Sequence, residues 1–297
     1  MNHKIFRYLN NKFKYLTILP VCILLIMFTF YPLVRLFYTS LNFVTIEGGK
    51  LVEKWIGLNN YISVFQDKIF RIAFFHTLVY VFTSVSLEII IAFLLAMLVS
   101  NIKKSTFYRT IFIIPFLIPP VVNGTMWRLM YNPHYGLINM INNFLGLPYQ
   151  YWLSNSSTAL MGIVVASVWQ WCGYSFLLLL AGLQSIPKNV FEAAKIDGAN
   201  GLNLIIRIII PILKPIILIT LMFRIIYAFK AFGLFYVLTG GGPGYSTEIL
   251  NTYIQKVFMT EQRIGFGSAA SVISILIIGI IAIGFRKRLD LEGGKMK

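Results

Sequence analysis

Six long runs of apolar residues, separated by polar segments, dominate the sequence. Each run is long enough to cross a bilayer as an α-helix, which takes about 20 residues. The runs occupy residues 16–38, 73–99, 110–130, 158–181, 208–235 and 268–285. We therefore predict an all-α polytopic membrane protein with six transmembrane helices, in which a membrane domain of residues 16–285 lies between a short head (residues 1–15) and a short tail (residues 286–297).

The composition agrees with this pattern. Hydrophobic residues make up 58% of the 297 residues and charged residues 12%, and the mean hydropathy is +0.76. An ordinary soluble domain has about 45–50% apolar and about 25% charged residues, so a soluble globular protein is excluded. Prolines inside the runs, such as Pro115 and Pro215, are tolerated where neighbouring helices or water satisfy the freed carbonyl groups. We therefore expect the helices to pack as a bundle.

The first run resembles the start of a secretory signal because it follows a basic head. The head carries Lys4, Arg7, Lys12 and Lys14. However, the apolar stretch behind it exceeds the length of about 7–15 residues found in signal sequences, and no A-x-A cleavage site follows. We expect the run to be retained as the first transmembrane helix.

The basic residues gather in alternate segments between the runs. Cytoplasmic segments are richer in lysine and arginine than external segments. Besides the head, the basic segments are residues 101–109, 182–207 and 286–297, whereas residues 131–157 have no lysine or arginine and those in residues 42–71 are partly offset by acidic side chains. This distribution predicts that both termini are cytoplasmic. It also explains the net charge of +16 by membrane orientation, and since no basic patch is interleaved with stacking aromatics, we expect no nucleic-acid partner.

The sequence contains no motif for enzyme chemistry. The Walker A pattern G-x-x-x-x-G-K-[ST] is absent, so any energy from ATP has to come from a partner. His3, His76 and His134 are scattered, without a second ligand four residues away, and Cys22 and Cys172 both lie in apolar runs. We therefore predict no catalytic residue, no metal site and no cofactor in this chain.

Ionisable side chains inside an apolar run are costly and are therefore candidates for function. Glu88 is the only carboxylate well inside a run, and Arg224 and Lys230 lie within the fifth run. Arg128, near the end of the third run, is expected to extend its guanidinium to the membrane surface. Ion-coupled carriers commonly use several buried acidic groups or matched broken helices. An ion-coupled secondary carrier is the alternative transport function, and a membrane-embedded enzyme is a third hypothesis, for which the sequence offers no catalytic group.

The polar segment of residues 184–207, between the fourth and fifth runs, is the most informative. Pro187 is typical of a helix start, residues 190–196 suit a short helix, and Asp197 followed by Gly198 is a turn signal. We predict a helix, a sharp turn and a second helix along the inner face of the membrane. Such a segment presents its side chains either to a cytosolic partner or, as an ordinary amphipathic loop, to the membrane surface, and physics alone slightly favours the second interpretation.

This segment follows the pattern E-A-A-x3-G-x9-I-x-L/I-P from Glu192 to Pro211. It resembles the loop that defines the membrane subunits of bacterial ATP-binding-cassette (ABC) importers. Further similarity to the sugar-importer branch is found in residues 57–61, 132–133, 136–139, 169–171 and 238–244. The glycine-rich run in the last of these is similar to that of the first of the two permeases in such systems. The sequence departs from the family where Leu202 and Ile205 replace the usual aromatic residues, and where an acidic residue often found near Gly233 is missing.

The resemblance implies the type I ABC importer permease fold, with residues 184–207 as its coupling loop. Glu192, Ala193, Ala194, Asp197 and Gly198 would then belong to a coupling helix seated in a cleft of an ATPase subunit. In this role Glu192 pairs with a basic group, Gly198 allows a positive φ, and Asp197 caps the following helix. Closure of the ATPases would push the permeases as rigid bodies and alternate the access of a cavity.

The resemblance also implies a set of partners. These are a different second permease that completes a heterodimer, two copies of an ABC ATPase that bind ATP and magnesium, an extracytoplasmic sugar-binding protein, the sugar itself and the bilayer. The substrate would be a mono- or oligosaccharide, or a related glycoside or polyol.

By the same similarity, the end of the fifth run lines the substrate path. Tyr227, Lys230, Ala231 and Gly233 lie there. A sugar presents hydroxyl groups and apolar ring faces, which suit hydrogen-bonding side chains beside an aromatic ring. The alternative is that Tyr227 packs against a neighbouring helix and that Lys230 reaches the outer surface. Residues 240–244 are expected to form an outer loop that meets the binding protein.

Overall fold

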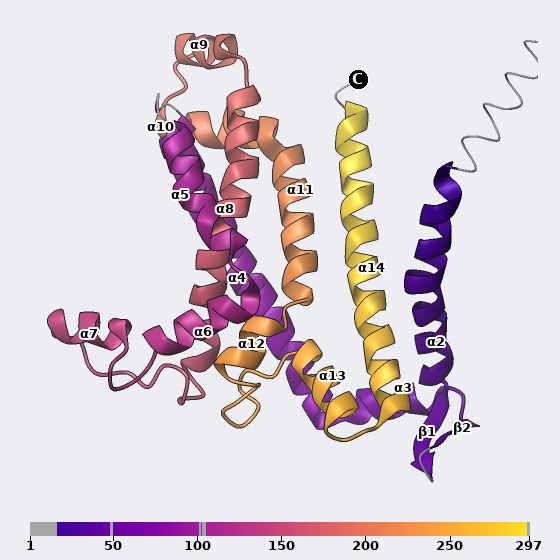
Figure 1. Cartoon of the computed structure of the whole chain (residues 1–297). Helices are drawn as coiled ribbons and strands as arrows, with labels where there is room; N and C mark the ends of the chain where they lie inside the picture. Colours follow the sequence, from indigo (N-terminus) through magenta and orange to yellow (C-terminus); the bar gives the residue numbers. More distant parts are fainter. Residues whose placement is uncertain (1–16, 48–49, 101, 103–104, 296–297) are drawn as a thin grey trace, which may run out of the picture. The chain divides into compact units, whose positions relative to one another are not determined.

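The computed structural model describes residues 17–47, 50–100, 102 and 105–295 (Figure 1). The basic head predicted at residues 1–15 lies outside the described residues, as do Lys103 and Lys104 of the second basic segment and Lys297 of the tail.

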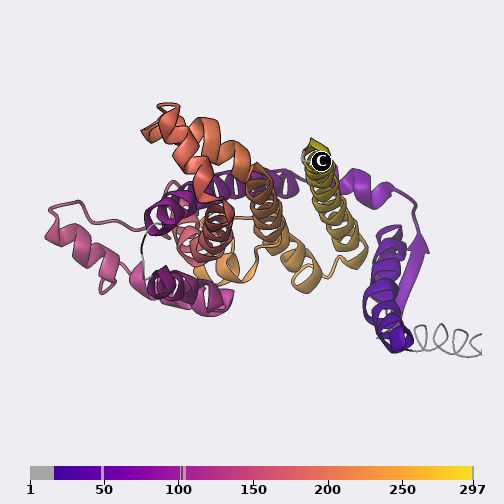
Figure 2. The same ribbon diagram turned by 90° about the horizontal axis from the view of Figure 1, so that it is seen from above.

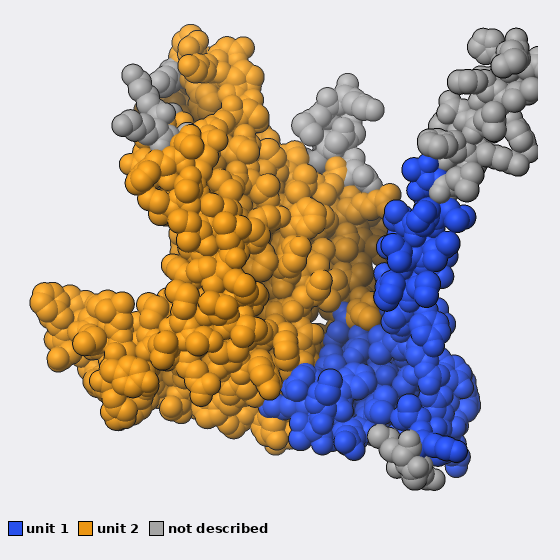
Figure 3. Space-filling view, viewed as in Figure 1, with its two compact units in different colours: residues 1–67, 254–274 blue, residues 68–253, 275–297 orange. Residues whose placement is uncertain are grey.

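The chain forms two compact units (Figure 3). The first unit consists of Met1–Asp67 and Ile254–Ser274, and the second of Lys68–Tyr253 and Ile275–Lys297. The first unit contains a helix described from Thr17 that includes the π-helical turn η1 (Ile26–Phe30) and α2 (Tyr31–Ser40), followed by β1 (Asn42–Glu47), β2 (Lys50–Trp55) and α3 (Asn59–Gln66). The second unit contains α4 (Lys68–Ser100), α5 (Ser105–Leu117), α6 (Pro120–Met130), α7 (Leu137–Phe144), α8 (Ala159–Ser185), α9 (Lys188–Ile196), α10 (Gly201–Leu204), η2 (Ile205–Ile209), α11 (Ile210–Phe229) and α12 (Gly233–Leu238). Two helices, α13 (Leu250–Met259) and α14 (Ile264–Lys295), contribute to both units.

Among the described residues, five helices are long and apolar enough to cross a membrane. They are Thr17–Ser40, Lys68–Ser100, Ala159–Ser185, Gly201–Phe229 and Ile264–Leu289. The helix Gly201–Phe229 corresponds to the fifth predicted run, at residues 208–235. It starts earlier than that run and ends earlier, at Phe229, because a break at residues 230–232 separates it from α12.

The third run, predicted as one span at residues 110–130, is a pair of helices bent by 94°. The break falls at Pro119, which is extended with φ −56° and ψ 142°. Pro119 and Pro120 cannot donate backbone hydrogen bonds, and a proline disfavours helical backbone in the residue before it. Counted as one broken span, the pair brings the membrane-crossing segments of the described chain to six.

The first unit also contains a short antiparallel hairpin that the apolar runs do not predict. Strands β1 and β2 pair from Asn42 opposite Trp55 to Glu47 opposite Lys50. The buried side-chain amide of Asn60, on α3, donates to the carbonyl groups of Ser40 and Asn42, both at 2.9 Å. These two bonds fix α3 against the base of the hairpin.

Helix α8 is the central helix of the second unit, in contact with α4, α5 and α11 (Figures 1 and 2). Gly173 permits the close approach of α5, because a Cβ atom at this position would lie 1.8 Å from the carbonyl oxygen of Phe112. The three contacts gather helices that are distant in the sequence around one axis.

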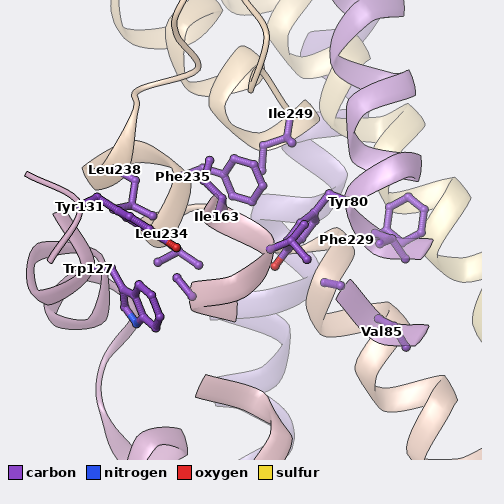
Figure 4. Close-up of a cluster of buried hydrophobic side chains, with 14 residues drawn as sticks. Tyr80, Val85, Trp127, Tyr131, Ile163, Phe229, Leu234, Phe235, Leu238 and Ile249 are labelled. Atoms are coloured by element: carbon purple, nitrogen blue, oxygen red, sulfur yellow. The ribbon is translucent and has the colours of Figure 1, made fainter. Parts of the chain in front are cut away.

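The apolar core of the second unit has two clusters. The first includes Tyr80, Trp127, Phe229 and Phe235 (Figure 4), and the rings of Tyr80 and Phe235 meet edge to face with centroids 4.7 Å apart. The second cluster, which we call the inner cluster, consists of Ala92, Ala96, Val99, Cys172, Phe176, Leu179, Leu180, Leu183, Ile186, Ile209 and Leu213. The inner cluster supports the segment that carries α9.

Candidate functional site

Helix α9 forms between a proline and a glycine, as its sequence predicts. Pro187 precedes it, and the N–H of Val190 donates to the Pro187 carbonyl at 3.1 Å. One side of α9 is anchored: Val190 and Phe191 pack against the inner cluster, and Ala194 is buried. The residues that hold α9 to the bundle are therefore apolar or small.

The opposite side of α9 faces away from the helix bundle. Glu192 and Ala193 are exposed, and the side chain of Ile196 is 86% exposed. Leu202, on the neighbouring α10, is 74% exposed. The two small residues predicted for this helix therefore differ, because Ala193 is exposed and Ala194 is buried. The exposed surface of α9 and α10 therefore combines the carboxylate of Glu192 with the uncovered apolar side chains of Ile196 and Leu202.

The turn after α9 depends on Gly198. This residue has φ +77°, and no atom lies within 4 Å of where its Cβ would be. The N–H of Asp197 donates to the carbonyl of Ala193 at 3.0 Å, and the N–H of Ala199 donates to that of Ala194 at 2.9 Å. These bonds are typical of a helix C-terminus that ends on a left-handed glycine. Gly198 thus adopts the positive φ that a glycine allows at this position.

The prediction that Asp197 caps the next helix is wrong. Helix α10 begins at Gly201, and its N-cap residue is Asn200, with no side-chain capping hydrogen bond. Asp197 is exposed and lies too early in the chain. The prediction placed the cap too early because the turn between α9 and α10 is longer than the Asp197-Gly198 signal alone indicates.

Helix α9 lies at one end of the second unit, beyond the end of α8 (Figure 1). Helices α6, α7 and α12 lie at the opposite end, and the part of α14 that belongs to this unit runs toward the end that carries α9 (Figure 1). The polar segment 184–207 is therefore separated from the α12 end by the length of the bundle.

An aromatic cluster lies between α5, α8 and α11. The ring of Tyr227 is 5.1 Å from the ring of Trp171, and the ring of Phe116 is 5.2 Å from Trp171 and 5.3 Å from Tyr174. Tyr227 is 45% exposed, and the other three rings are half-buried. We call these four residues the aromatic platform. It offers ring faces that are only partly covered by the chain.

The four residues predicted for the substrate path separate into two pairs. Lys230 is exposed at the end of α11, with its Nζ atom 5.8 Å from the Tyr227 ring. Ala231 packs against the first apolar cluster, and Gly233 lies against α6, where a Cβ would be 3.2 Å from a methyl group of Val121. Tyr227 and Lys230 therefore lie together, whereas Ala231 and Gly233 serve the packing of the break between α11 and α12.

A buried ion pair lies behind the platform. Arg224 donates from Nε to Oε1 of Glu88 at 2.5 Å and from Nη2 to Oε2 at 2.7 Å, and the Ser175 hydroxyl donates to Oε1 at 2.7 Å. All three residues are fully buried. Sequence analysis identified Glu88 and Arg224 as separate candidates and missed their pairing, as well as the part played by Trp171 and Tyr174.

The missed residues carry a partial signal in their spacing. Trp171 and Tyr174 are three residues apart on one helix, as are Arg224 and Tyr227 on another, so each pair shares a face. The spacing does not indicate that the two faces meet. Arg128 is exposed at its helix end and donates from Nη1 to the Val237 carbonyl at 3.3 Å, and its extension to the membrane surface stays a prediction.

The membrane-length helices are typical of a multi-pass membrane protein. The comparison with protein families makes the class specific. Residues 88–291 match the family described as binding-protein-dependent transport system inner membrane component, and the chain belongs to this family. It is therefore a multi-pass permease subunit of an ABC importer in the cytoplasmic membrane, and neither an enzyme nor an ion-coupled carrier.

Relatives of similar length are also named as permease proteins of transport systems. The chain is 36% identical over 283 residues to the trehalose/maltose transport system permease protein MalF of Thermococcus litoralis, covering 95% of both chains. It is 34% identical over 260 residues to the sulfoquinovosyl glycerol transport system permease protein SmoG of Agrobacterium fabrum, covering 87% of this chain and 84% of the relative.

Solved structures share the fold. A chain of a bacterial alginate ABC transporter, in complex with an alginate pentasaccharide-bound periplasmic protein, superimposes with a TM-score of 0.81 at 22% identity, covering 93% of each chain. The predicted type I importer permease fold is confirmed.

Proposed function

We propose that this chain is one of two different permease subunits of an ATP-driven importer for sugars or related glycosides and polyols. The named substrates of its relatives support this substrate class. They are trehalose and maltose, sulfoquinovosyl glycerol, and sn-glycerol-3-phosphate, all of which are sugars, glycosides or polyol derivatives with more than one free hydroxyl group. The chain forms half of the translocation path, and the second permease forms the other half.

The remaining partners follow from the same proposal. Two copies of an ABC ATPase bind ATP and magnesium on the cytoplasmic side, and an extracytoplasmic binding protein delivers the sugar. Both termini are cytoplasmic, with the head at residues 1–15, the tail at residues 286–297, and α9 on the same side. The surplus of basic residues in the segment 182–207 supports this orientation.

The exposed side of α9 is the observation that carries the proposal. A helix held by Val190, Phe191 and the buried Ala194 transmits a push to the bundle, because Val190 and Phe191 pack against the cluster that contains residues of α8 and α11. Its outward carboxylate, Glu192, is free to pair with a basic group of an ATPase. The exposed Ile196 and Leu202 supply apolar area for the same contact. Ala193 allows close approach, and Asp197 and Gly198 shape the turn beside it.

Co-purification with the ATPase tests this assignment. Glu192→Lys reverses the charge, and Gly198→Pro cannot adopt the φ of +77° that the turn requires. We expect both variants to remain in the membrane and to lose the ATPase. The control is Glu261→Lys, which reverses an exposed carboxylate of the other unit and is expected to retain it. Retention of the ATPase by both test variants, or sugar uptake by the lone chain under a proton gradient, would contradict the proposal.

We assign the sugar path to the aromatic platform together with Lys230. The half-covered rings of Trp171 and Tyr227 suit the apolar faces of a sugar, and the ammonium group of Lys230 is able to donate to its hydroxyl groups. Ala231 and Gly233 keep the helix break beside them compact. Trp171→Ala and Tyr227→Ala should lower sugar transport in the assembled importer, whereas Phe82→Ala, which removes an exposed ring from α4, should not.

A further inference from the structure

We propose that Glu88 is a positioning residue of the sugar path, acting through Arg224 on the aromatic platform. This inference rests on the assignment of the sugar path made above. Glu88 is fully buried and pairs with Arg224, and Arg224 is the residue that contacts a ring of the platform. Its influence therefore has to pass through the guanidinium group that it holds.

The geometry fixes that guanidinium in one plane. Two of its nitrogen atoms donate to the two oxygen atoms of Glu88, at 2.5 and 2.7 Å, and such two-point contacts set orientation as well as distance. The hydroxyl of Ser175 donates to the same carboxylate at 2.7 Å. The carboxylate is thus held from α8 as well as from α11, and neither charged group is left to rotate.

The fixed guanidinium packs against one ring of the aromatic platform, that of Trp171. Its Cζ atom lies 4.0 Å from the centre of the Trp171 ring, well within the range of a cation–π contact. The Trp171 ring in turn lies 5.1 Å from that of Tyr227. The order of contacts is therefore Glu88, Arg224, Trp171 and Tyr227, and it leads from a fully buried carboxylate to a ring that is 45% exposed.

Arg224 has a third nitrogen atom, Nη1, that does not take part in the two bonds to Glu88. Its Nη1 atom is buried and has no hydrogen-bond partner within the part of the chain that the structure describes. A buried donor without a partner is costly, so the pair is not arranged for stability alone. The Nη1 atom belongs to the guanidinium group that is held beside the Trp171 ring.

Stability alone does not account for the pair. Replacing a buried ion pair with apolar residues is often neutral or stabilising, whereas removing one partner is strongly destabilising. Charged residues within a membrane span are retained mainly for function. The pair therefore has a use that two apolar side chains would not serve, and the nearest group that benefits from it is Trp171.

The test measures sugar transported per ATP hydrolysed by the assembled importer in proteoliposomes, with the binding protein saturated. Glu88→Gln removes the charge that orients Arg224. The double variant Glu88→Leu with Arg224→Met removes both charges and leaves no unpaired one, so it is expected to fold. In both variants we expect the ratio to fall about fivefold, as for the loss of a contact of cation–π strength, because a sugar that is poorly held is not carried through when ATP is consumed.

A matched control comes from the same helix. Ser84 is fully buried one turn before Glu88, and its hydroxyl donates to the Tyr80 carbonyl within α4 at 2.6 Å. Ser84→Ala should change the ratio by no more than about twofold. A conservative variant, Glu88→Asp, keeps the charge but is too short for both contacts, and it should restore part of the loss seen with Glu88→Gln.

The outcomes separate this inference from the one on which it rests. If the double variant assembles and its ratio equals that of the wild type, Glu88 has no positioning role. If the double variant does not assemble, the pair only holds the helices together, and the inference is likewise wrong. If Trp171→Ala and Tyr227→Ala also leave the ratio unchanged, the sugar path itself has been misassigned.

Discussion

The two carboxylates Glu192 and Glu88 have opposite surroundings within one unit of the chain. Glu192 is exposed on the outward side of α9, next to small and apolar side chains. Glu88 is fully buried in α4 and accepts three hydrogen bonds. A charge on the surface is solvated at almost no cost to folding, whereas a buried charge has to be paired and hydrogen-bonded. The surface charge is thus available to a partner, and the buried charge organises its own chain.

The largest effect is expected from Arg224→Met. The substitution leaves Glu88 buried and without its counter-ion, which costs about 3–5 kcal/mol in the free energy of unfolding. Thermal unfolding of the purified importer would reveal this as a lower midpoint. The double variant Glu88→Leu with Arg224→Met should recover most of the loss. A single variant as stable as the wild type would show that water or another group reaches the carboxylate.

A smaller effect is expected at the turn after α9. Gly198→Ala meets no steric obstacle, since nothing lies within 4 Å, but an L-residue at φ +77° costs about 1–2 kcal/mol. The change should be local and should appear as faster hydrogen exchange of the amides in α9 and α10. Gly284→Ala is the control, because it lies in the open in helix α14 without a positive φ. Equal exchange in the two variants would contradict the role of the turn.

Ser175→Ala should have a more modest effect on stability. It removes one of the three hydrogen bonds to Glu88 and leaves the ion pair intact. Hydrogen bonds between membrane helices contribute about 0.6 kcal/mol on average and at most about 1.7 kcal/mol. Thr220→Ala, which loses a bond within its own helix, provides the comparison. If Ser175→Ala destabilised the protein as much as Arg224→Met, the carboxylate would depend on the hydroxyl rather than on the guanidinium.

The smallest effect on folding is expected from Glu192→Gln. An exposed position away from the core changes the free energy of unfolding by no more than about 0.5 kcal/mol. Binding of the ATPase, measured with the purified partners, should nevertheless weaken, because the negative charge of Glu192 that pairs with a basic group of the ATPase is lost. Glu261→Gln is the matched exposed carboxylate. A loss of thermal stability with unchanged ATPase binding would reverse the comparison between the two carboxylates.

The sequence predicts those features whose determinants are local. Pro187 and Gly198 lie at the two ends of one short segment, and each acts through its own backbone geometry. The short helix and the left-handed turn were therefore predictable. The apolar runs predicted the long helices for a similar reason, because a membrane span is defined by its own length and composition.

The features that sequence analysis missed depend on which faces meet. Glu88 and Arg224 are 136 residues apart. The apolar pattern of either helix does not indicate that these two side chains form a pair. The prolines at positions 119 and 120 were visible in the third run and mark where it breaks, but they do not specify the angle of 94° at which α5 packs on α8 and α6 packs on α12. The hairpin of β1 and β2 is too short to stand out beside the apolar runs.

The uncovered side of α9 has a consequence for the life of the subunit before assembly. Ile196 and Leu202 are 86% and 74% exposed, close to a turn whose backbone is not protected by other elements. Exposed apolar side chains of this kind invite aggregation, and an exposed turn is a preferred place for proteases to cut. A newly made copy that has not met its ATPase is therefore expected to be more prone to aggregation and proteolysis than a copy in the assembled importer.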